Sequence, residues 1–358
     1  MYYSKKDALM TRGLAIISMV VLHLFCRQGA DVLGTPLIWL NESKPLVYLF
    51  GFFSEICVPL YSLCAGYAQE LLYEQNRSSR KDRMHRIVKL LINYWIIVVL
   101  FSILGLFFDS TGNMPGSWSD FAKSLVLLHS YNGAWWYLHT YIIMLMIPPH
   151  ILLWPVRKLK LVPGLLLCFV MNCAWYAIQR IGLLPDAATL FPTAGFVLTE
   201  VENLIGILAY VWAGAYLCRN QCMERAGKWF DQKVQKKWQK AVLLSVFLAV
   251  FLGFNTLHKS VLTSIVALTV FLLFNLWKKS RTTERIFLFL GRHSTNIWLT
   301  HMFFYIYVFT GLVQRAKYPL FMLGFMMILC IMTSYIVQII YRGLERILNL
   351  KSLGLSAP

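Results

Sequence analysis

Charged side chains are scarce in this sequence. They make up 14% of its 358 residues, whereas soluble domains carry about 25%. Acidic residues are the scarcest, because 16 Asp and Glu stand against 34 Lys and Arg, which gives a net charge of +18. Hydrophobic residues make up 58% of the chain and recur in long apolar runs from end to end. This composition excludes a soluble globular protein and predicts an all-α, polytopic membrane protein.

Cysteine is present, but without the pattern of a disulfide framework or a zinc site. Most of the eight cysteines fall inside apolar runs, where a thiol behaves as a small hydrophobic group. Cys218 and Cys222 have three residues between them and no histidine nearby, which is not the pattern of a metal site. We therefore expect no metal.

The apolar runs predict ten membrane spans in a single domain that covers residues 1–358. The expected spans lie near residues 8–26, 45–68, 87–108, 134–154, 162–180, 199–218, 241–257, 260–277, 294–312 and 319–341. With an even number of spans, both termini lie in the cytoplasm and most Lys and Arg fall in cytoplasmic loops. This asymmetry follows the positive-inside rule. The membrane thus accounts for the positive charge, and no nucleic-acid partner is expected.

Two connecting segments are expected to form helices at the inner membrane surface. Residues 219–240 are basic and contain Trp229, Phe230 and Trp238, which is typical of an interfacial amphipathic helix. Residues 284–291 are expected to form a second, shorter one. The outer loops are long enough to cap an outer cavity, and they lie at residues 27–43, 109–133 and 181–198.

Arg12 and His23 lie in the first expected span, and the residues between them are apolar or small. Eleven helical steps return the chain to within about 20° of the same face and climb roughly 16 Å. Arg12 can therefore face the membrane surface while His23 lies deep on the same side. A neutral imidazole there can accept a proton, as a general base must. A histidine that only packs is an equally weighted alternative, and arginines at span ends are usually surface anchors.

Arg83 and Arg86 open the third expected span. They are three residues apart, so they share a helix face and can grip a phosphate group together. For this pair taken alone, positive-inside bias is the simpler explanation.

Glu55 and His301 are ionisable residues inside expected spans. A carboxyl group at mid-span is costly unless it is paired or protonated. Glu55 can balance Arg12 or His23 or serve as a buried structural partner, and the structural role is slightly favoured. Pro59 is expected to kink the helix near Glu55. His301 is a second intramembrane histidine at moderate depth.

Aromatic and acidic residues cluster at the outer ends of two spans. Trp135 and Trp136 are typical of the aromatic belt at a membrane interface, and His139 is then interfacial as well. Glu200 and Glu202 open the sixth span. We interpret them as solvated carboxylates in preference to contacts with a hydroxylated substrate.

Five short motifs, taken in order, resemble those of the acyltransferase 3 family of integral membrane acyltransferases, and the resemblance covers nearly the whole chain. They are Arg12 with His23 (R-x10-H), Val58-Pro59-Leu60-Tyr61 with Gly66-Tyr67, Arg83 with Arg86 (R-x-x-R), Trp136-Tyr137-Leu138, and Gly291 with Ser294 and His301. One departure is that Cys64-Ala65-Gly66-Tyr67 stands where the family usually has Ser-Gly-Phe.

The resemblance implies a membrane-bound O-acyltransferase in the cytoplasmic membrane of a bacterium. Such an enzyme moves an acyl group, usually acetyl, from cytoplasmic acyl-CoA to a hydroxyl of an envelope carbohydrate or its lipid-linked precursor. Acetyl-CoA, or another acyl-CoA, would then be the donor substrate. The other partners would be the glycan acceptor and membrane lipids.

The resemblance also suggests how the candidate site residues divide. Arg12, Arg83 and Arg86 would bind the phosphates of CoA. His23 would deprotonate the acceptor hydroxyl or carry the acyl group itself, and the sequence leaves both routes open. Glu55 and His301 are the other candidate catalytic residues.

Two other functions remain open at the level of sequence. A proton-coupled transporter or flippase for a lipid-linked sugar could use Glu55, His23 and His301 as a proton relay. Such proteins often contain repeated halves, and none is visible here. A membrane module that only senses or scaffolds would not bind acyl-CoA.

Overall fold

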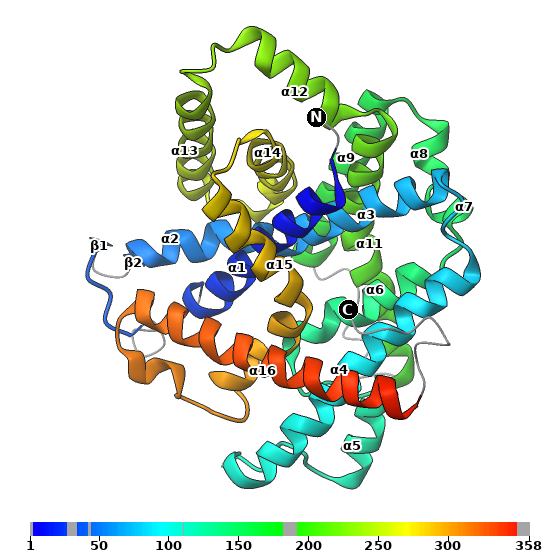
Figure 1. Ribbon diagram of the computed structural model, residues 1–358, viewed down its shortest axis with the longest axis vertical. Helices are drawn as coiled ribbons and strands as arrows, with labels where there is room; N and C mark the ends of the chain where they lie inside the picture. The colour runs from blue at the N-terminus through cyan, green and yellow to red at the C-terminus, as the bar shows by residue number, and fades with distance from the viewer. Residues whose placement is uncertain (1–2, 27–33, 42–43, 110, 182–191, 349–358) are drawn as a thin grey trace. The chain divides into compact units, whose positions relative to one another are not determined.

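The computed structural model describes residues 3–26, 34–41, 44–109, 111–181 and 192–348 (Figure 1). Helices dominate, and the strands described are the short antiparallel pair β1 (Trp39–Asn41) and β2 (Lys44–Pro45). The chain divides into two compact units. Unit 1 comprises Met1–Met19, Phe52–Ser79 and Met146–Arg292, and unit 2 comprises Val20–Gly51, Arg80–Leu145 and His293–Pro358.

Four helices contribute residues to both units. They are α1 (Lys5–Phe25), α2 (Leu46–Phe53), α6 (Trp136–Met146) and α15 (Arg281–Thr300). The other helices of unit 1 are η1 (Ser54–Ile56), α3 (Cys57–Glu74), α7 (Pro149–Leu152), α8 (Trp154–Lys158), α9 (Leu161–Ile181), α11 (Pro192–Arg219), α12 (Cys222–Lys233), α13 (Gln239–Leu257), η3 (Ser260–Leu262) and α14 (Thr263–Leu276). The other helices of unit 2 are α4 (Arg80–Phe108), α5 (Trp118–Leu125), η2 (Gly133–Trp135), η4 (His301–Phe304), η5 (Val313–Ala316) and α16 (Pro319–Ile347).

Seven helical segments of the described chain are long and apolar enough to cross a membrane. They are Lys5–Phe25, Leu46–Glu74, Arg80–Phe108, Leu161–Gln179, Gly195–Arg219, Gln239–Leu257 and Pro319–Ile347. Each coincides with a span expected from the sequence. The chain is therefore a multi-pass, all-helical membrane protein.

The expected count of ten spans is not confirmed, because three of the expected segments form shorter helices. The segment expected at 134–154 breaks after Met146, where Pro148 and Pro149 have no backbone N–H to continue the helix. The segment expected at 294–312 stops being α-helical at Thr300. The third, Ser260–Leu276, is apolar but short.

The separate surface helix expected at 284–291 is also wrong. Those residues belong to α15, which runs without a break to Thr300. A kink is expected near Pro59, and there α2 gives way to the 3-10 turn η1 at residues 54–56 before α3 begins. The proline ring clashes with the carbonyl four residues earlier, which is that of Glu55.

Within unit 1, α3 and α11 pack backbone against backbone. A Cβ on Gly66 of α3 would lie 1.8 Å from the carbonyl oxygen of Val211, and one on Gly214 of α11 would lie 2.1 Å from that of Leu63. Membrane helices associate closely through such small residues. Any side chain larger than hydrogen at either glycine would force these helices apart.

In the same unit, an ion-pair cluster around the buried carboxylate of Glu70 links the C-terminal part of α3 to α8 and α11. Glu70 is fully buried, and its Oε1 lies 3.1 Å from Nη2 of Arg157 and 3.6 Å from Nη1 of Arg219. The guanidinium of Arg157 also lies over the ring of Tyr73, 4.3 Å from its centroid. Both arginine side chains keep about one third of their surface exposed (34% and 36%), so the pair stays partly hydrated.

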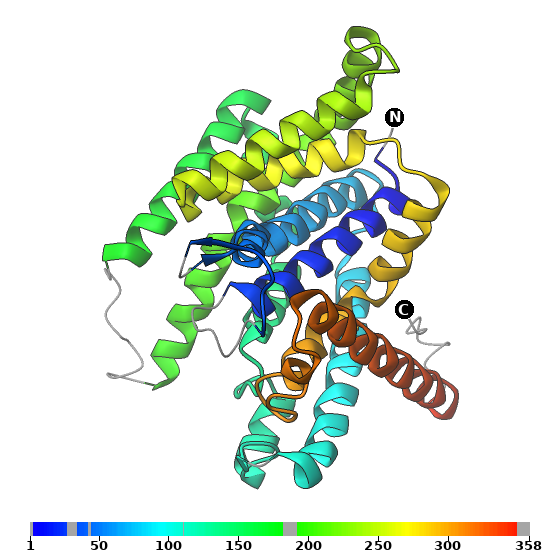
Figure 2. The same ribbon diagram turned by 90° about the vertical axis from the view of Figure 1, so that its left-hand side faces the viewer.

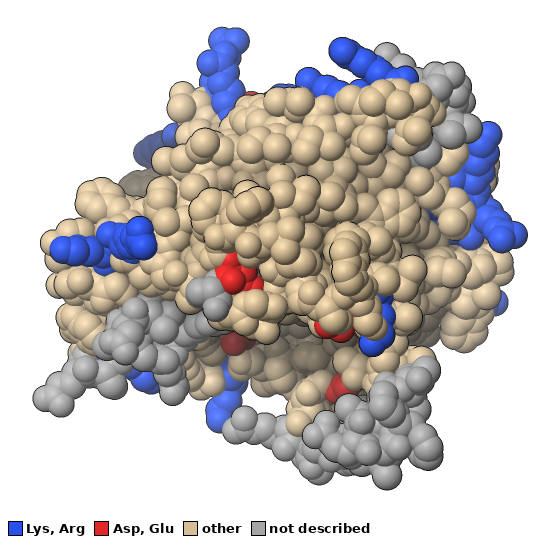
Figure 3. Space-filling model, turned by 90° about the horizontal axis from the view of Figure 1, so that it is seen from below, with Lys and Arg blue, Asp and Glu red and all other residues tan. Residues whose placement is uncertain are grey.

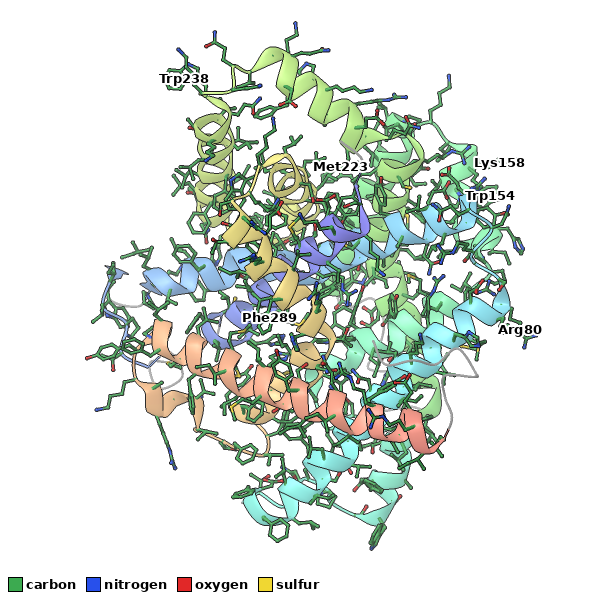
Figure 4. The ribbon with its side chains drawn as sticks, in the orientation of Figure 1. Arg80, Trp154, Lys158, Met223, Trp238 and Phe289 are labelled. Atoms are coloured by element: carbon green, nitrogen blue, oxygen red, sulfur yellow. The ribbon has the colours of Figure 1, made fainter. Side chains whose placement is uncertain are left out.

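The helix expected within residues 219–240 is confirmed as α12. Phe230 is buried, whereas Trp229 is 61% exposed. Trp238, labelled in Figure 4 where the chain enters α13, is 57% exposed.

Figure 2 shows α13 and α14 side by side beyond this connection. On the face seen in Figure 3, neutral residues predominate, and Lys and Arg lie mainly along the margins of the view.

The core of unit 2 is aromatic. Tyr94 and Phe101 of α4, Trp135 of η2 and Phe303 of η4 are all fully buried. The rings of Phe101 and Phe303 stack with centroids 4.2 Å apart, and Tyr94 meets Trp135 edge-on at 4.8 Å. These contacts hold η4, which follows α15, and η2 against α4.

Candidate functional site

Helix α1 carries both residues of the first motif. It is continuous from Lys5 to Phe25, so Arg12 and His23 share a helix face with about 16 Å between them along the axis. Arg12 belongs to unit 1 and His23 to unit 2. Both side chains are half-buried, and the hydroxyl of Tyr305 donates to the carbonyl oxygen of His23 at 3.2 Å.

His23 and His301 lie together in unit 2. Their ring centroids are 5.0 Å apart, with 52° between the ring planes. The two residues are far apart in sequence, and both were candidates for chemistry from sequence alone. His301 is fully buried and His23 is half-buried, so His23 is the more accessible of the two residues.

The protonation of His301 is fixed by its surroundings. Its Nδ1 lies 2.8 Å from the carbonyl oxygen of Trp298 and 3.2 Å from that of Ile297. A carbonyl oxygen can only accept, so Nδ1 carries a hydrogen. Because His301 is fully buried, the charged imidazolium is disfavoured, so the ring is neutral and Nε2 carries the lone pair. Nε2 is buried and has no hydrogen-bond partner among the described residues. Unit 2 thus holds a neutral imidazole with a basic nitrogen beside a second imidazole.

The loop before α6 is bonded to the last turn of α15. The carbonyl oxygen of Leu299 accepts from Nδ2 of Asn132 at 3.2 Å and from Nε1 of Trp135 at 3.0 Å. In return, Nε1 of Trp298 donates to the carbonyl oxygen of Ala134 at 2.9 Å. These bonds satisfy helix-end carbonyls that have no partner within the helix, and they fix the turn that carries His301.

The interfacial-belt interpretation is therefore wrong for Trp135, which is fully buried. It holds better for Trp136, which is 36% exposed. His139 is buried as well and not interfacial. A tryptophan at a span end can serve either purpose, because its N–H seeks a partner at a lipid surface and inside a protein alike.

Arg83 and Arg86 lie near the N-terminal end of α4, in the same unit as the two histidines. Both side chains are half-buried. Nε of Arg83 donates to the carbonyl oxygen of Leu145 at 3.0 Å, which holds its guanidinium at this end of the helix. Figure 4 labels Arg80, the first residue of α4.

Glu55 lies in unit 1, apart from the unit that holds the histidine pair. Its Oε1 accepts from the hydroxyl of Ser260 at 3.2 Å, and its Oε2 accepts from that of Thr263 at 3.3 Å. Both carboxylate oxygens thus have partners that join η1 to η3 and α14. These contacts favour the structural role that the sequence left open beside the catalytic one.

The interpretation of Glu200 as a solvated carboxylate is wrong, because its side chain is buried on α11. Glu202 is the acceptor of a hydrogen bond from Nε2 of Gln179 on α9. Within the described residues, no group of three or more His, Cys, Asp and Glu side chains could hold a metal ion.

Sequence reasoning gave no role to several buried asparagines of unit 2, the unit that holds the histidine pair. Asn132 is one. Asn93 and Asn296 are two others, since Nδ2 of Asn93 donates to Oδ1 of Asn296 in the interior of unit 2. An asparagine inside an apolar helix was the available signal, because a buried amide is costly without partners.

One of three comparisons with known proteins finds a match. The sequence profile of the acyltransferase 3 family, described as an acyltransferase domain, matches residues 10–342. That range contains every motif residue singled out above. Comparison with curated proteins and with solved structures finds no match. Because the profile covers almost the whole of the 358-residue chain, the chain belongs to the acyltransferase 3 family.

Proposed function

We propose that the protein is an O-acyltransferase of a bacterial cytoplasmic membrane. It moves an acyl group, most simply acetyl, from cytoplasmic acyl-CoA to a hydroxyl of an envelope carbohydrate or of its lipid-linked precursor. The observation that carries the proposal is the histidine pair of unit 2. The family supports acyl transfer, and the pair supplies the base that transfer to a hydroxyl requires.

In this mechanism His23 is the general base and His301 positions it. Nδ1 of His301 is held by two carbonyls, so its Nε2 can accept the N–H of His23 once substrate is bound. The two rings are already adjacent, and catalytic hydrogen bonds often close only in the substrate complex. The opposite nitrogen of His23 is then free of its proton and can receive one.

The chemical step follows from that arrangement. His23 takes the proton of the acceptor hydroxyl while the hydroxyl oxygen attacks the thioester carbonyl. The carbon–sulfur bond breaks, and the CoA thiolate leaves with the proton that His23 had taken. In an acyl-histidine route His23 would attack the thioester first and expel the CoA thiolate. The acceptor hydroxyl would then attack the acyl-imidazole, which releases His23, and the hydroxyl proton would pass to the thiolate. Arg83 and Arg86, which belong to the same unit as the histidine pair, bind the CoA phosphates in either case.

The test is turnover of radiolabelled acetyl-CoA by purified protein in nanodiscs. Wild type should bind the label and release or transfer acetate. His23→Ala should bind equally well but lose about 100-fold or more of the turnover, which is the usual worth of a general base. His150→Ala is the matched control, because His150 is an exposed histidine of unit 1.

Two results would count against the proposal. If His23→Ala keeps its turnover, His23 is a packing residue. If folded wild-type protein binds neither acetyl-CoA nor longer acyl-CoA donors, the protein is not a CoA-dependent acyltransferase. In that second case, transport of a lipid-linked sugar would have to be assayed instead.

A further inference from the structure

A chain of buried polar side chains crosses the interior of unit 2. Asn93 of α4 is 3% exposed, Asn296 of α15 is 4% exposed and Ser334 of α16 is fully buried. Nδ2 of Asn93 donates to Oδ1 of Asn296. Nδ2 of Asn296 donates to the hydroxyl of Ser334 at 3.0 Å and reaches its carbonyl oxygen at 3.4 Å.

This chain of bonds fixes which way each amide points. The carbonyl oxygen of Ser334 can only accept, so the NH₂ group of Asn296 must face it. The oxygen of Asn296 therefore faces Asn93 and takes a hydrogen from its NH₂ group. The oxygen of Asn93 is left over. It is buried and has no hydrogen-bond partner in the part of the chain that the structure describes.

A buried acceptor without a donor is unfavourable, and such atoms in folded proteins call for a specific explanation. The hydrogen bond between Asn93 of α4 and Asn296 of α15 does not explain this unpaired oxygen, because that bond uses the NH₂ group of Asn93 and leaves its oxygen unused. A ligand that brings an N–H or O–H group would satisfy the oxygen.

The position of Asn93 indicates what kind of ligand that is. Asn93 lies seven residues after Arg86 on α4, which is about 10 Å along the helix and within about 20° of the same face. Its partner Asn296 lies five residues before His301, the first residue of η4, which is about 7 Å along the helix axis and roughly 140° around it. Phe101, eight residues after Asn93, stacks on Phe303, seven residues after Asn296, so α4 and α15 run in the same direction. Along them the order is guanidinium, amide oxygen, imidazole.

An acyl-CoA molecule carries its groups in the matching order. Its phosphates come first, then the two amides of the uncharged pantetheine arm, then the thioester. We propose that Oδ1 of Asn93 accepts the N–H of a pantetheine amide and so holds the arm between the phosphate-binding arginines and the histidine pair. This inference rests on the proposed function, because it takes acyl-CoA as the donor.

The experiment removes the proposed hydrogen bond in two ways, by deleting the N–H donor from the ligand and by deleting the Asn93 acceptor from the protein. Two acetyl-CoA analogues are used, each with one pantetheine amide replaced by an ester, which deletes a single N–H. Wild type should bind one of the two analogues about 3- to 10-fold more weakly than acetyl-CoA, the range of one ordinary hydrogen bond. Asn93→Leu should bind acetyl-CoA more weakly by a similar factor and should no longer distinguish that analogue.

Asn296→Leu is the matched control. It breaks the same tie between α4 and α15 but leaves Oδ1 of Asn93 in place, so it should still distinguish the two analogues. If wild type binds both esters as tightly as acetyl-CoA, the proposal for Asn93 is overturned even if Asn93→Leu does not fold. If wild type does not bind acetyl-CoA at all, the proposed function is wrong, and the inference about Asn93, which depends on it, is wrong as well.

Discussion

Two ionisable groups, the half-buried Glu55 of unit 1 and the fully buried His301 of unit 2, show two different uses of a polar side chain. Both oxygens of Glu55 accept from hydroxyls of its own unit. His301 uses one nitrogen to anchor itself and keeps the other, buried, without a partner among the described residues. A satisfied buried group holds a fold together, whereas an unsatisfied one marks a place where a ligand or a proton belongs.

The largest effect in unit 2, after that of His23, is expected at His301. His301→Ala should lower kcat by about 100-fold, because His23 loses the group that orients it. His301→Gln keeps an acceptor at this position and should recover part of the loss. Turnover of acetyl-CoA in nanodiscs measures both. A structural role alone predicts instead that both variants lose stability and that Gln rescues nothing.

A smaller effect is expected where the donor's phosphates would bind. Arg86→Ala should weaken acetyl-CoA binding by about 10-fold, the worth of a charge-assisted hydrogen bond, with little change in kcat. Equilibrium binding at two salt concentrations checks this, since the difference should shrink at high salt. Lys81→Ala, an exposed cation on the same helix, is the control. Equal affinities for wild type and Arg86→Ala would remove Arg86 from the phosphate site.

The bond from Trp135 to the end of α15 should matter less. Trp135→Phe deletes the hydrogen bond to Leu299, whose carbonyl keeps its bond to Asn132. We expect a loss of about 1 kcal/mol in stability and a fall of roughly 5-fold in kcat from the less constrained His301. Trp136→Phe should leave both unchanged. Thermal unfolding and kcat are measured together, and an unaltered kcat would separate this bond from the chemistry.

The smallest effect is expected in unit 1. Glu55→Gln can still exchange hydrogen bonds with both hydroxyls, so acetyl transfer should stay within about 3-fold of wild type and stability should fall by at most about 1 kcal/mol. The same transfer assay decides the point. A loss of about 100-fold in well-folded protein would restore Glu55 as a catalytic residue and erase the contrast between the units.

Local sequence pattern was sufficient for the long helices. Seven apolar runs became helices of spanning length, and the break beside Glu55 followed from Pro59. The pattern failed where distant contacts decide the structure. The ninth expected span ends at Thr300, where the carbonyls of the preceding turn bond to side chains, including Asn132 and Trp135 from a remote loop. No local pattern encodes that exchange.

The site was predictable to the same extent. His23 stood out because an imidazole inside an apolar helix is rare, and His301 for the same reason. Their proximity could not be derived, since it depends on the fold of unit 2. Trp135 was assigned to the membrane interface because composition does not distinguish a buried indole from an interfacial one. Asn93 gave no signal of a free oxygen, which only its partners reveal.

The central claim is that the two histidines act as one unit, and a double-mutant cycle tests it most directly. Turnover of acetyl-CoA would be measured for wild type, His23→Ala, His301→Ala and the double variant under identical conditions. When two residues act as one unit, substituting either one removes the contribution of both to turnover. The double variant should therefore be no slower than His23→Ala. If the two losses multiply instead, the histidines contribute independently and the account of His301 as the group that positions His23 is contradicted.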